Sequence, residues 1–96
     1  MLFHVTWNFV DSSEEGQRRS LELFSKWQPG PAKFLGFYAF ADGSGGMALV
    51  ESDSATDLAK TVAPWSPWLE FNVRPLIPVQ ESAQINMEAI KWRDNN

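Results

Sequence analysis

The chain has 96 residues, 44% of them hydrophobic, and its eight basic and twelve acidic residues give a net charge of −4. This composition supports one packed core and excludes a disordered chain, while the acidic balance opposes binding to nucleic-acid phosphates or to an anionic membrane. Because no cysteine and no membrane-spanning stretch is present, we expect one domain over residues 1–96, without disulfides, in the cytoplasm.

A strand followed by a helix is predicted at the start of the chain. Residues 2–9 alternate apolar with polar side chains, and this period of two is typical of a strand. Residues 11–27 are predicted to form a helix, because Ser12 and Glu15 have the spacing of a capping box and Lys26 lies in the last turn. The predicted buried stripe comprises apolar residues at helical spacing: Leu21, Leu23, Phe24 and Trp27.

Two apolar strands joined by a Gly-rich turn occupy the centre of the chain. Residues 33–41 form the first strand, and the second runs from Gly46 or Met47 to Glu51. The segment between them, residues 42–46, is predicted to be a hairpin turn, since glycine allows positive φ at little cost. It opens a strand and not a helix, so no phosphate site is predicted there.

A second helix, a strand and a terminal helix complete the predicted order. Ser54 caps a helix that ends at Ala63, and an aromatic loop, residues 65–68, follows it. Residues 69–79 are predicted to be an edge strand, because two prolines there cannot donate to a ladder. Residues 81–93 are predicted to form a helix that packs on the sheet edge or on a partner.

The order strand, helix, strand, strand, helix, strand predicts an α+β fold of the ferredoxin-like βαββαβ type, with a four-stranded antiparallel sheet and an extra C-terminal helix. Right-handed crossovers put both helices on one sheet face and leave the other face open. Alternation of side chains assigns these residues to the open face, although the central strands are apolar on either parity: Leu2, His4, Thr6, Asn8, Phe34, Gly36, Tyr38, Phe40, Met47, Leu49, Glu51, Glu70, Asn72 and Arg74. Such a patch is larger than monomers usually expose, so we expect a homodimer in which two open faces pack together.

Three segments carry a resemblance to a known family: LFHVTWNF at the start, FADGSGGMALVES in the hairpin, and PWSPWLEFNVRPLIPV near the end. With these segments in this order, the chain resembles the dimeric α+β barrel superfamily, and within it a small bacterial and marine environmental family of unknown function. The resemblance implies a dimeric α/β barrel and a pocket location. The superfamily includes cofactor-free monooxygenases, muconolactone isomerases, haem-degrading enzymes, chlorite dismutases and ligand-sensing modules, but these residues carry no catalytic motif of the nearest family.

Polar side chains of the predicted open face are the candidate site residues. His4, the one histidine, is a candidate general base or orienting donor, with a hydrogen-bonded interface histidine as the alternative. Arg74 and Asn72 are candidates for binding a carboxylate or enolate oxygen, or for a salt bridge across a dimer seam. His4 and Arg74 are thus the candidate catalytic residues. The predicted ligand-binding residues are His4, Thr6, Asn8, Tyr38, Asn72 and Arg74.

Neither a metal nor a cofactor is expected. One histidine and scattered carboxylates, without cysteine, do not make a three- or four-ligand metal set. The aromatic loop of residues 65–68 is either the rim of a pocket for an apolar ligand or a plug that closes the end of the barrel.

Three functions remain open at this point. The first is a homodimeric protein that binds a small apolar or aromatic molecule in an aromatic-lined cleft. The second is a cofactor-independent monooxygenase or isomerase that acts on a small aromatic or enolisable compound. The third is a purely structural dimerisation module whose open face serves only packing. None of the three requires a nucleic acid or a membrane.

Overall fold

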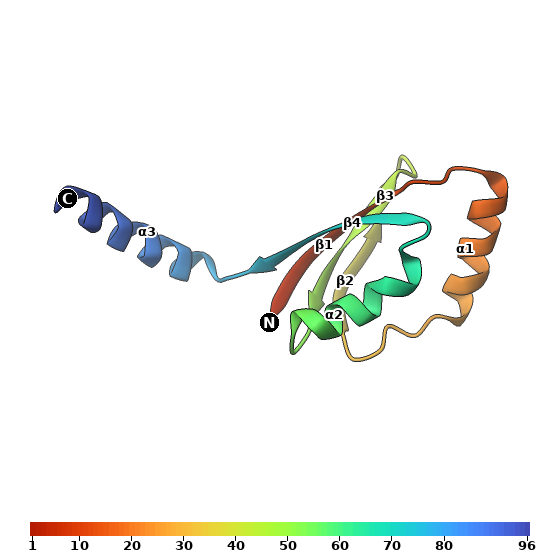
Figure 1. Ribbon diagram of the computed structural model, residues 1–96, viewed down its shortest axis with the longest axis horizontal. Coiled ribbons are helices and arrows are strands. Elements are labelled where there is room, and N and C mark those ends of the chain that lie inside the picture. The colour runs from red at the N-terminus through yellow and green to blue at the C-terminus, as the bar shows by residue number, and fades with distance from the viewer.

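Four antiparallel strands form one sheet in the order β2-β3-β1-β4 in a computed structural model that describes all 96 residues (Figure 1). β1 pairs with β3 on one side and β4 on the other, so β2 and β4 are the two edges. This confirms the predicted ferredoxin-like βαββαβ order with an extra C-terminal helix. The elements are β1 (Leu2–Phe9), α1 (Glu14–Lys26), β2 (Lys33–Ala39), β3 (Gly45–Glu51), α2 (Ala55–Val62), the 3₁₀ turn η1 (Ala63–Trp65), β4 (Leu69–Leu76) and α3 (Val79–Asp94).

The core lies between the sheet and α2. Burying a Val, Leu or Phe side chain stabilises a fold by about 1.5–3 kcal/mol, so the buried apolar side chains between the sheet and α2 are a main source of stability. The hydroxyl of Thr61 in α2 donates to the carbonyl oxygen of Pro29 at 2.7 Å and ties the helix to the loop before β2. Five side chains at the centre of the core are at most 3% exposed: Phe3, Val5, Ala48, Val50 and Leu58.

The helix caps explain where α1 and α2 begin. The capping residue of α1 is Ser13, one position later than predicted, and its Oγ accepts the N–H of Gly16 at 3.0 Å. The carboxylate of Asp11 accepts the N–H of Ser13 at 2.9 Å, and this backbone hydrogen bond holds the pKa of Asp11 below its ordinary value. The predicted cap of α2 is confirmed, because Ser54 Oγ accepts the N–H of Asp57 at 3.1 Å.

The hairpin turn lies two residues earlier than predicted, over residues 40–44 instead of 42–46. Gly43 has a φ of 77°, which only glycine adopts at little cost. The carboxylate of Asp42 accepts the hydroxyl of Ser44 at 2.7 Å and its N–H at 3.0 Å, and these hydrogen bonds lower the pKa of Asp42. The chain then enters β3 at Gly45, so the last two glycines of the predicted turn belong to a strand.

Those two strand glycines are required by close packing and not by a turn. A Cβ on Gly46 would run into the indole ring of Trp7 and the carbonyl oxygen of Tyr38. A Cβ on Gly45 would run into the backbone of Trp7 itself. The Trp7 ring therefore lies over β3, on the same side of the sheet as the core.

A β-bulge between Phe34 and Gly36 changes the side on which β2 presents its first residues. Phe34 pairs with Val50 and packs against the core, so its predicted position on the open face is wrong. Beyond the bulge the alternation is as predicted. Gly36 and Tyr38 lie opposite Leu49 and Met47 and share the open face with them.

The helix α1 stands off the sheet, although its apolar stripe was predicted to be buried. Leu21 is 69% exposed and Phe24 is 52% exposed. The gap between α1 and the sheet is spanned by aromatic side chains, as described below. α2 and not α1 therefore covers the central strands.

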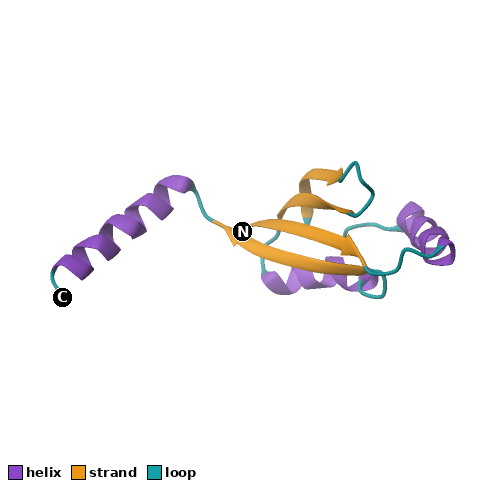
Figure 2. Ribbon diagram, turned by 90° about the horizontal axis from the view of Figure 1, so that it is seen from above, coloured by secondary structure: helices purple, strands orange, loops and turns teal.

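The helix α3 leaves the rest of the molecule (Figures 1 and 2). No residue of α3 is buried, and the molecule measures 60 × 27 × 20 Å. Its radius of gyration is 17.5 Å, against about 12.5 Å for a compact chain of this length. α3 thus extends as an arm beyond the end of β4. Neither this helix nor any other in the structure is long and apolar enough to cross a membrane.

Candidate ligand-binding site

A cavity of about 370 Å³ lies between α1 and the helix-covered face of the sheet. Ligand sites in proteins usually enclose about 300–1,000 Å³ and are mostly apolar, and this cavity has both properties. Fourteen of its sixteen lining residues are hydrophobic. Its wall includes eight aromatic side chains: Trp7, Phe9, Phe24, Trp27, Phe34, Phe37, Trp65 and Phe71.

Six of these eight aromatic rings form one connected cluster around Trp27 and Phe37. The Trp27 ring meets the Trp65 ring edge to face, with centroids 5.4 Å apart, and the Phe34 ring at 5.7 Å. The Phe37 ring lies 4.8 Å from Phe34 and 5.4 Å from Trp7. Pairs in this range stabilise by about 0.5–1.5 kcal/mol beyond burial. The cluster therefore holds the cavity wall in shape without closing the cavity.

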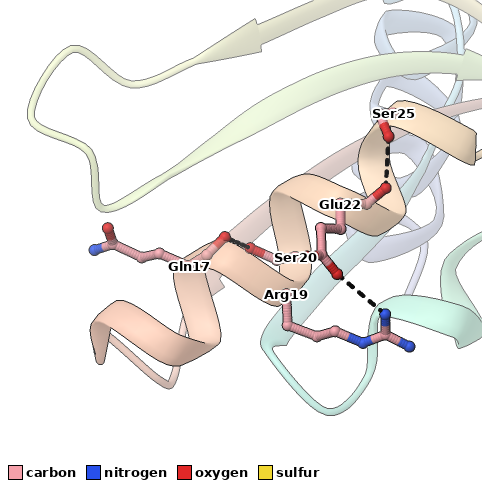
Figure 3. Close-up of polar contacts among 5 residues, drawn as sticks. All are labelled: Gln17, Arg19, Ser20, Glu22 and Ser25. Atoms are coloured by element: carbon pink, nitrogen blue, oxygen red, sulfur yellow. Dashed lines mark hydrogen bonds and ion pairs between the residues drawn. The ribbon is translucent and has the colours of Figure 1, made fainter.

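The polar side chains of α1 make no hydrogen bond to another element. As Figure 3 shows, Ser20 and Ser25 donate to the carbonyl oxygens of Gln17 and Glu22, at 3.0 and 2.6 Å. Arg19 meets the carboxylate of Glu22 at 3.3 Å within the same helix. Apolar contacts alone attach α1 to the sheet side, so the helix can shift without breaking a polar link.

The chemistry of the cavity is that of shape and apolar contact. Its wall holds no titratable side chain, and Ser20 is its one polar side chain. The indole N–H of Trp65 is buried and has no hydrogen-bond acceptor, whereas the other buried side-chain nitrogen and oxygen atoms all have a partner. A buried donor without a partner costs about 1–3 kcal/mol.

The position of Trp65 bears on whether the aromatic loop of residues 65–68 is the rim of a pocket or a plug. It is 8% exposed and lines the cavity, and Trp68 packs against it with ring centroids 6.4 Å apart without lining the cavity itself. The first tryptophan of the loop is therefore a wall residue, and the second one supports it from behind.

The predicted site residues lie on the opposite face of the sheet. His4 stands directly between Arg74 and Leu49 on the two neighbouring strands. Thr6 stands between Asn72 and Met47, so the register brings the predicted polar residues into adjacent rows. Tyr38 is the cross-strand partner of Met47 on the same face, and Asn8 follows at the end of β1, opposite Glu70.

None of these polar side chains has a partner within the chain. His4, Thr6, Asn8, Tyr38, Asn72 and Arg74 take part in no side-chain hydrogen bond and no ion pair, so their polar atoms are available to a second molecule. Their roles in binding or catalysis stay predictions. No group of three or more His, Asp or Glu side chains is placed to hold a metal ion.

The residues that line the cavity were not predicted as a site. Phe34 was assigned to the open face and the 65–68 loop was considered as a pocket rim, but most of the other lining residues were assigned to the core, because an apolar aromatic at strand or helix spacing predicts packing equally well. One signal was present in the sequence: the aromatic residues of α1, β2 and the 65–68 loop are too many and too large for a small core. Eight of the thirteen aromatic residues in the chain line this one cavity.

Fold and site together define a small α+β protein with an aromatic cavity on the helix-covered face and a polar row on the open face. A family model described as "Domain of unknown function (DUF3303)" matches residues 1–90. Because this match spans nearly the whole chain, the protein belongs to that family. A search of curated proteins found no match.

Proposed function

We propose that this protein is a homodimer that binds a small, flat, apolar molecule in the cavity between α1 and the sheet. The observation that carries the proposal is the cavity itself: about 370 Å³, walled by eight aromatic rings. At about 30 Å³ per water molecule, it has the volume of roughly twelve waters, which suits a small polycyclic compound. Rings stacked or set edge-on around a flat ligand would repeat the contacts that they make with one another.

The unpaired indole N–H of Trp65 favours ligands that carry a hydrogen-bond acceptor. Its indole N–H lacks an acceptor and its ring lines the cavity. Because this N–H is covered in the unliganded protein, a ligand hydroxyl or carbonyl oxygen at this end of the cavity would accept the hydrogen bond once the Trp65 ring turns toward it. Phenolic and carbonyl-bearing aromatic compounds are therefore favoured over plain hydrocarbons. The apolar wall supplies affinity, and the single donor supplies orientation.

The open face supports the homodimer. It carries Met47, Leu49 and Tyr38 beside the unpartnered row of His4 and Arg74. Two such faces packed together would bury the apolar half and let the polar row pair across the seam, as interfaces with an apolar core and a polar rim do. In this arrangement the ligand and the second copy occupy different faces of the sheet.

A binding experiment on the cavity tests the proposal. Trp7, Trp27 and Trp65 line the cavity, so tryptophan fluorescence should report the binding of 2-naphthol, and naphthalene should bind more weakly. Ala39→Trp puts a large ring into the wall and should lower the affinity at least about tenfold. Ala41→Trp, just outside the cavity, is the matched control and should leave it unchanged. Trp65→Phe should remove the preference for 2-naphthol.

Equal affinity in the Ala39→Trp and wild-type proteins, or no saturable binding of any aromatic probe by the wild type, would overturn the cavity proposal.

A further inference from the structure

We infer that α3 of each copy packs along the exposed β2 edge of the other copy, so that the dimer is held by two exchanged helices as well as by its sheets. This inference rests on the homodimer proposed above. Its first support is that α3 has nothing to pack on in its own chain. Helices of this length owe most of their stability to tertiary packing of an apolar face.

The side chains of α3 form a surface suited to burial. Gln80, Gln84, Glu88 and Lys91 follow one another on a single polar stripe. Val79, Met87 and Ile90 lie on one side of the helix and Ile85 and Trp92 on another, with Ser82, Asn86 and Arg93 between the two groups. These five apolar side chains are between 49% and 79% exposed.

The segment between β4 and α3 directs the helix away from its own sheet. Only Ile77 and Pro78 separate the two elements, and Pro75 lies just before them. Proline fixes its own φ and restricts the preceding residue to extended conformations, so this connection is short and stiff. Pro78 itself is extended, with φ −58° and ψ 144°. α3 therefore reaches outward, clear of its own sheet.

The two edges of the sheet differ in how well they are protected. The outer edge of β4 carries Pro75 and the charged residues Glu70 and Arg74, which discourage pairing with another strand. The outer edge of β2 has no such residue beyond Lys33 at its start. Leu35 and, just beyond the strand, Phe40 are exposed apolar side chains here, beside Phe37 of the cavity wall and Tyr38 of the open face.

A helix is one of the usual covers of an exposed edge strand. The chain's own α3 starts from β4, three strand spacings or about 14 Å from β2, and points away from the sheet. The uncovered helix and the uncovered edge are therefore complementary surfaces that one copy cannot join by itself. Two copies related by a two-fold axis can join both pairs, and such an exchange closes without leaving a free surface.

The area of contact favours the exchange. A face of four strands, each about seven residues long, has a projected area of about 450 Å². Each α3 is about 24 Å long and about 10 Å wide, so giving one arm while receiving another about doubles the projected area of contact per copy. The exchanged arms would therefore add about as much contact as the open faces.

Photocrosslinking on the full chain tests this inference. A benzophenone amino acid replaces Leu35 on the β2 edge, and this protein is mixed with an isotopically heavy wild-type copy. We expect crosslinks from position 35 to heavy peptides of α3, residues 79–94. The same probe at Glu70, on the β4 edge, should give no crosslink to heavy α3.

Sedimentation of arm variants gives the second measurement. Met87→Glu with Ile90→Glu should raise the dimer dissociation constant about 100-fold, because two large side chains lose their burial. The matched control, Gln84→Glu with Lys91→Glu on the polar stripe, should change it less than about threefold. A dimer that keeps its affinity in the apolar double variant and crosslinks only through its strands would overturn the arm exchange and leave the proposed homodimer intact. A wild-type monomer would overturn both.

Discussion

The two faces of this sheet are built from the same four strands, yet they differ in chemistry. The helix-covered face carries Phe3, Val5 and Trp7 from β1 and opens into an aromatic cavity without a titratable group. The open face carries His4, Thr6 and Asn8 from the same strand. Alternation along a strand thus separates an apolar ligand site from a polar contact surface by one residue. We assign the first face to the ligand and the second to the partner copy, and the predictions below perturb these two faces and the turn that joins β2 to β3.

The largest effect is expected for Gly46→Ala on the helix-covered face. The added Cβ meets the Trp7 ring and the backbone oxygen of Tyr38, and the backbone cannot yield as a side chain can. We expect a loss of more than about 3 kcal/mol in the free energy of unfolding by urea. Gly36→Ala on the open face is the control. Its Cβ would meet the mobile ring of Tyr38 at 3.2 Å, so a change below about 1 kcal/mol is expected. Equal losses would contradict the difference in packing between the faces.

The next effect is on association. Leu49→Asp places a charge in the middle of the open face, next to His4. Burying it in the proposed interface should raise the dimer dissociation constant by at least about 100-fold in sedimentation experiments. Binding of 2-naphthol should be unchanged, since Leu49 does not line the cavity. A Glu70→Gln variant at the edge of the face should dimerise as the wild type does.

A smaller effect is expected when two neighbouring residues of β2, Phe37 and Tyr38, are each replaced by alanine. Phe37 contacts the rings of Trp7, Phe24, Trp27 and Phe34, so Phe37→Ala should lower the free energy of unfolding by about 2 kcal/mol and weaken aromatic binding. Tyr38→Ala, on the open face and 67% exposed, should change unfolding by less than about 0.5 kcal/mol in the Leu49→Asp monomer.

The reverse order of these two stability losses would show that the aromatic cluster around Phe37 does not hold the cavity wall in place.

The smallest effect concerns the hairpin turn that joins β2 to β3. The hydroxyl and N–H of Ser44 lower the pKa of Asp42 below 3.8, so the ionised carboxylate stabilises the fold. This contribution is present above the ordinary carboxyl pKa and is lost as pH falls through the lowered folded-state pKa. Asp42→Asn should therefore unfold at slightly lower urea near neutral pH. The difference should shrink as pH falls through the lowered pKa and vanish once the carboxyl is protonated in both states, and a difference that persists there would exclude the charged hydrogen bond as its cause.

Local patterns predicted most of the fold because each element had its own signal. The period of two in β1, the Ser54 cap of α2 and Pro75 in the edge strand β4 each indicated the local conformation directly. Two features had no local signal. The bulge at Leu35 reverses the side of Phe34, and no residue type announces it. The glycines at 45 and 46 resemble a turn in sequence, and only the ring of Trp7 explains them.

The site was harder to predict than the fold. Polar residues were assigned to the open face because the period of two places them on one side of β1 and β4, and their role as a site stays a prediction. An aromatic-lined cleft was predicted, but its lining residues were missed because they are of the kind that normally fill a core. The distance of α1 from the sheet depends on the sum of their sizes and not on any one position. Leu21 and Phe24 have the helical spacing of buried residues and are nevertheless exposed at the cavity.

One measurement directly tests whether the ligand binds on the helix-covered face and the partner copy on the open face. In a methyl NMR spectrum of protein labelled at Met, Leu and Val, we predict that 2-naphthol shifts the signals of Val5, Val62 and Leu69, which line the cavity. Dilution of the protein should instead shift those of Met47 and Leu49 on the open face. If 2-naphthol moved Met47 and Leu49 while the cavity methyls stayed in place, the ligand would occupy the open face and the account would be contradicted.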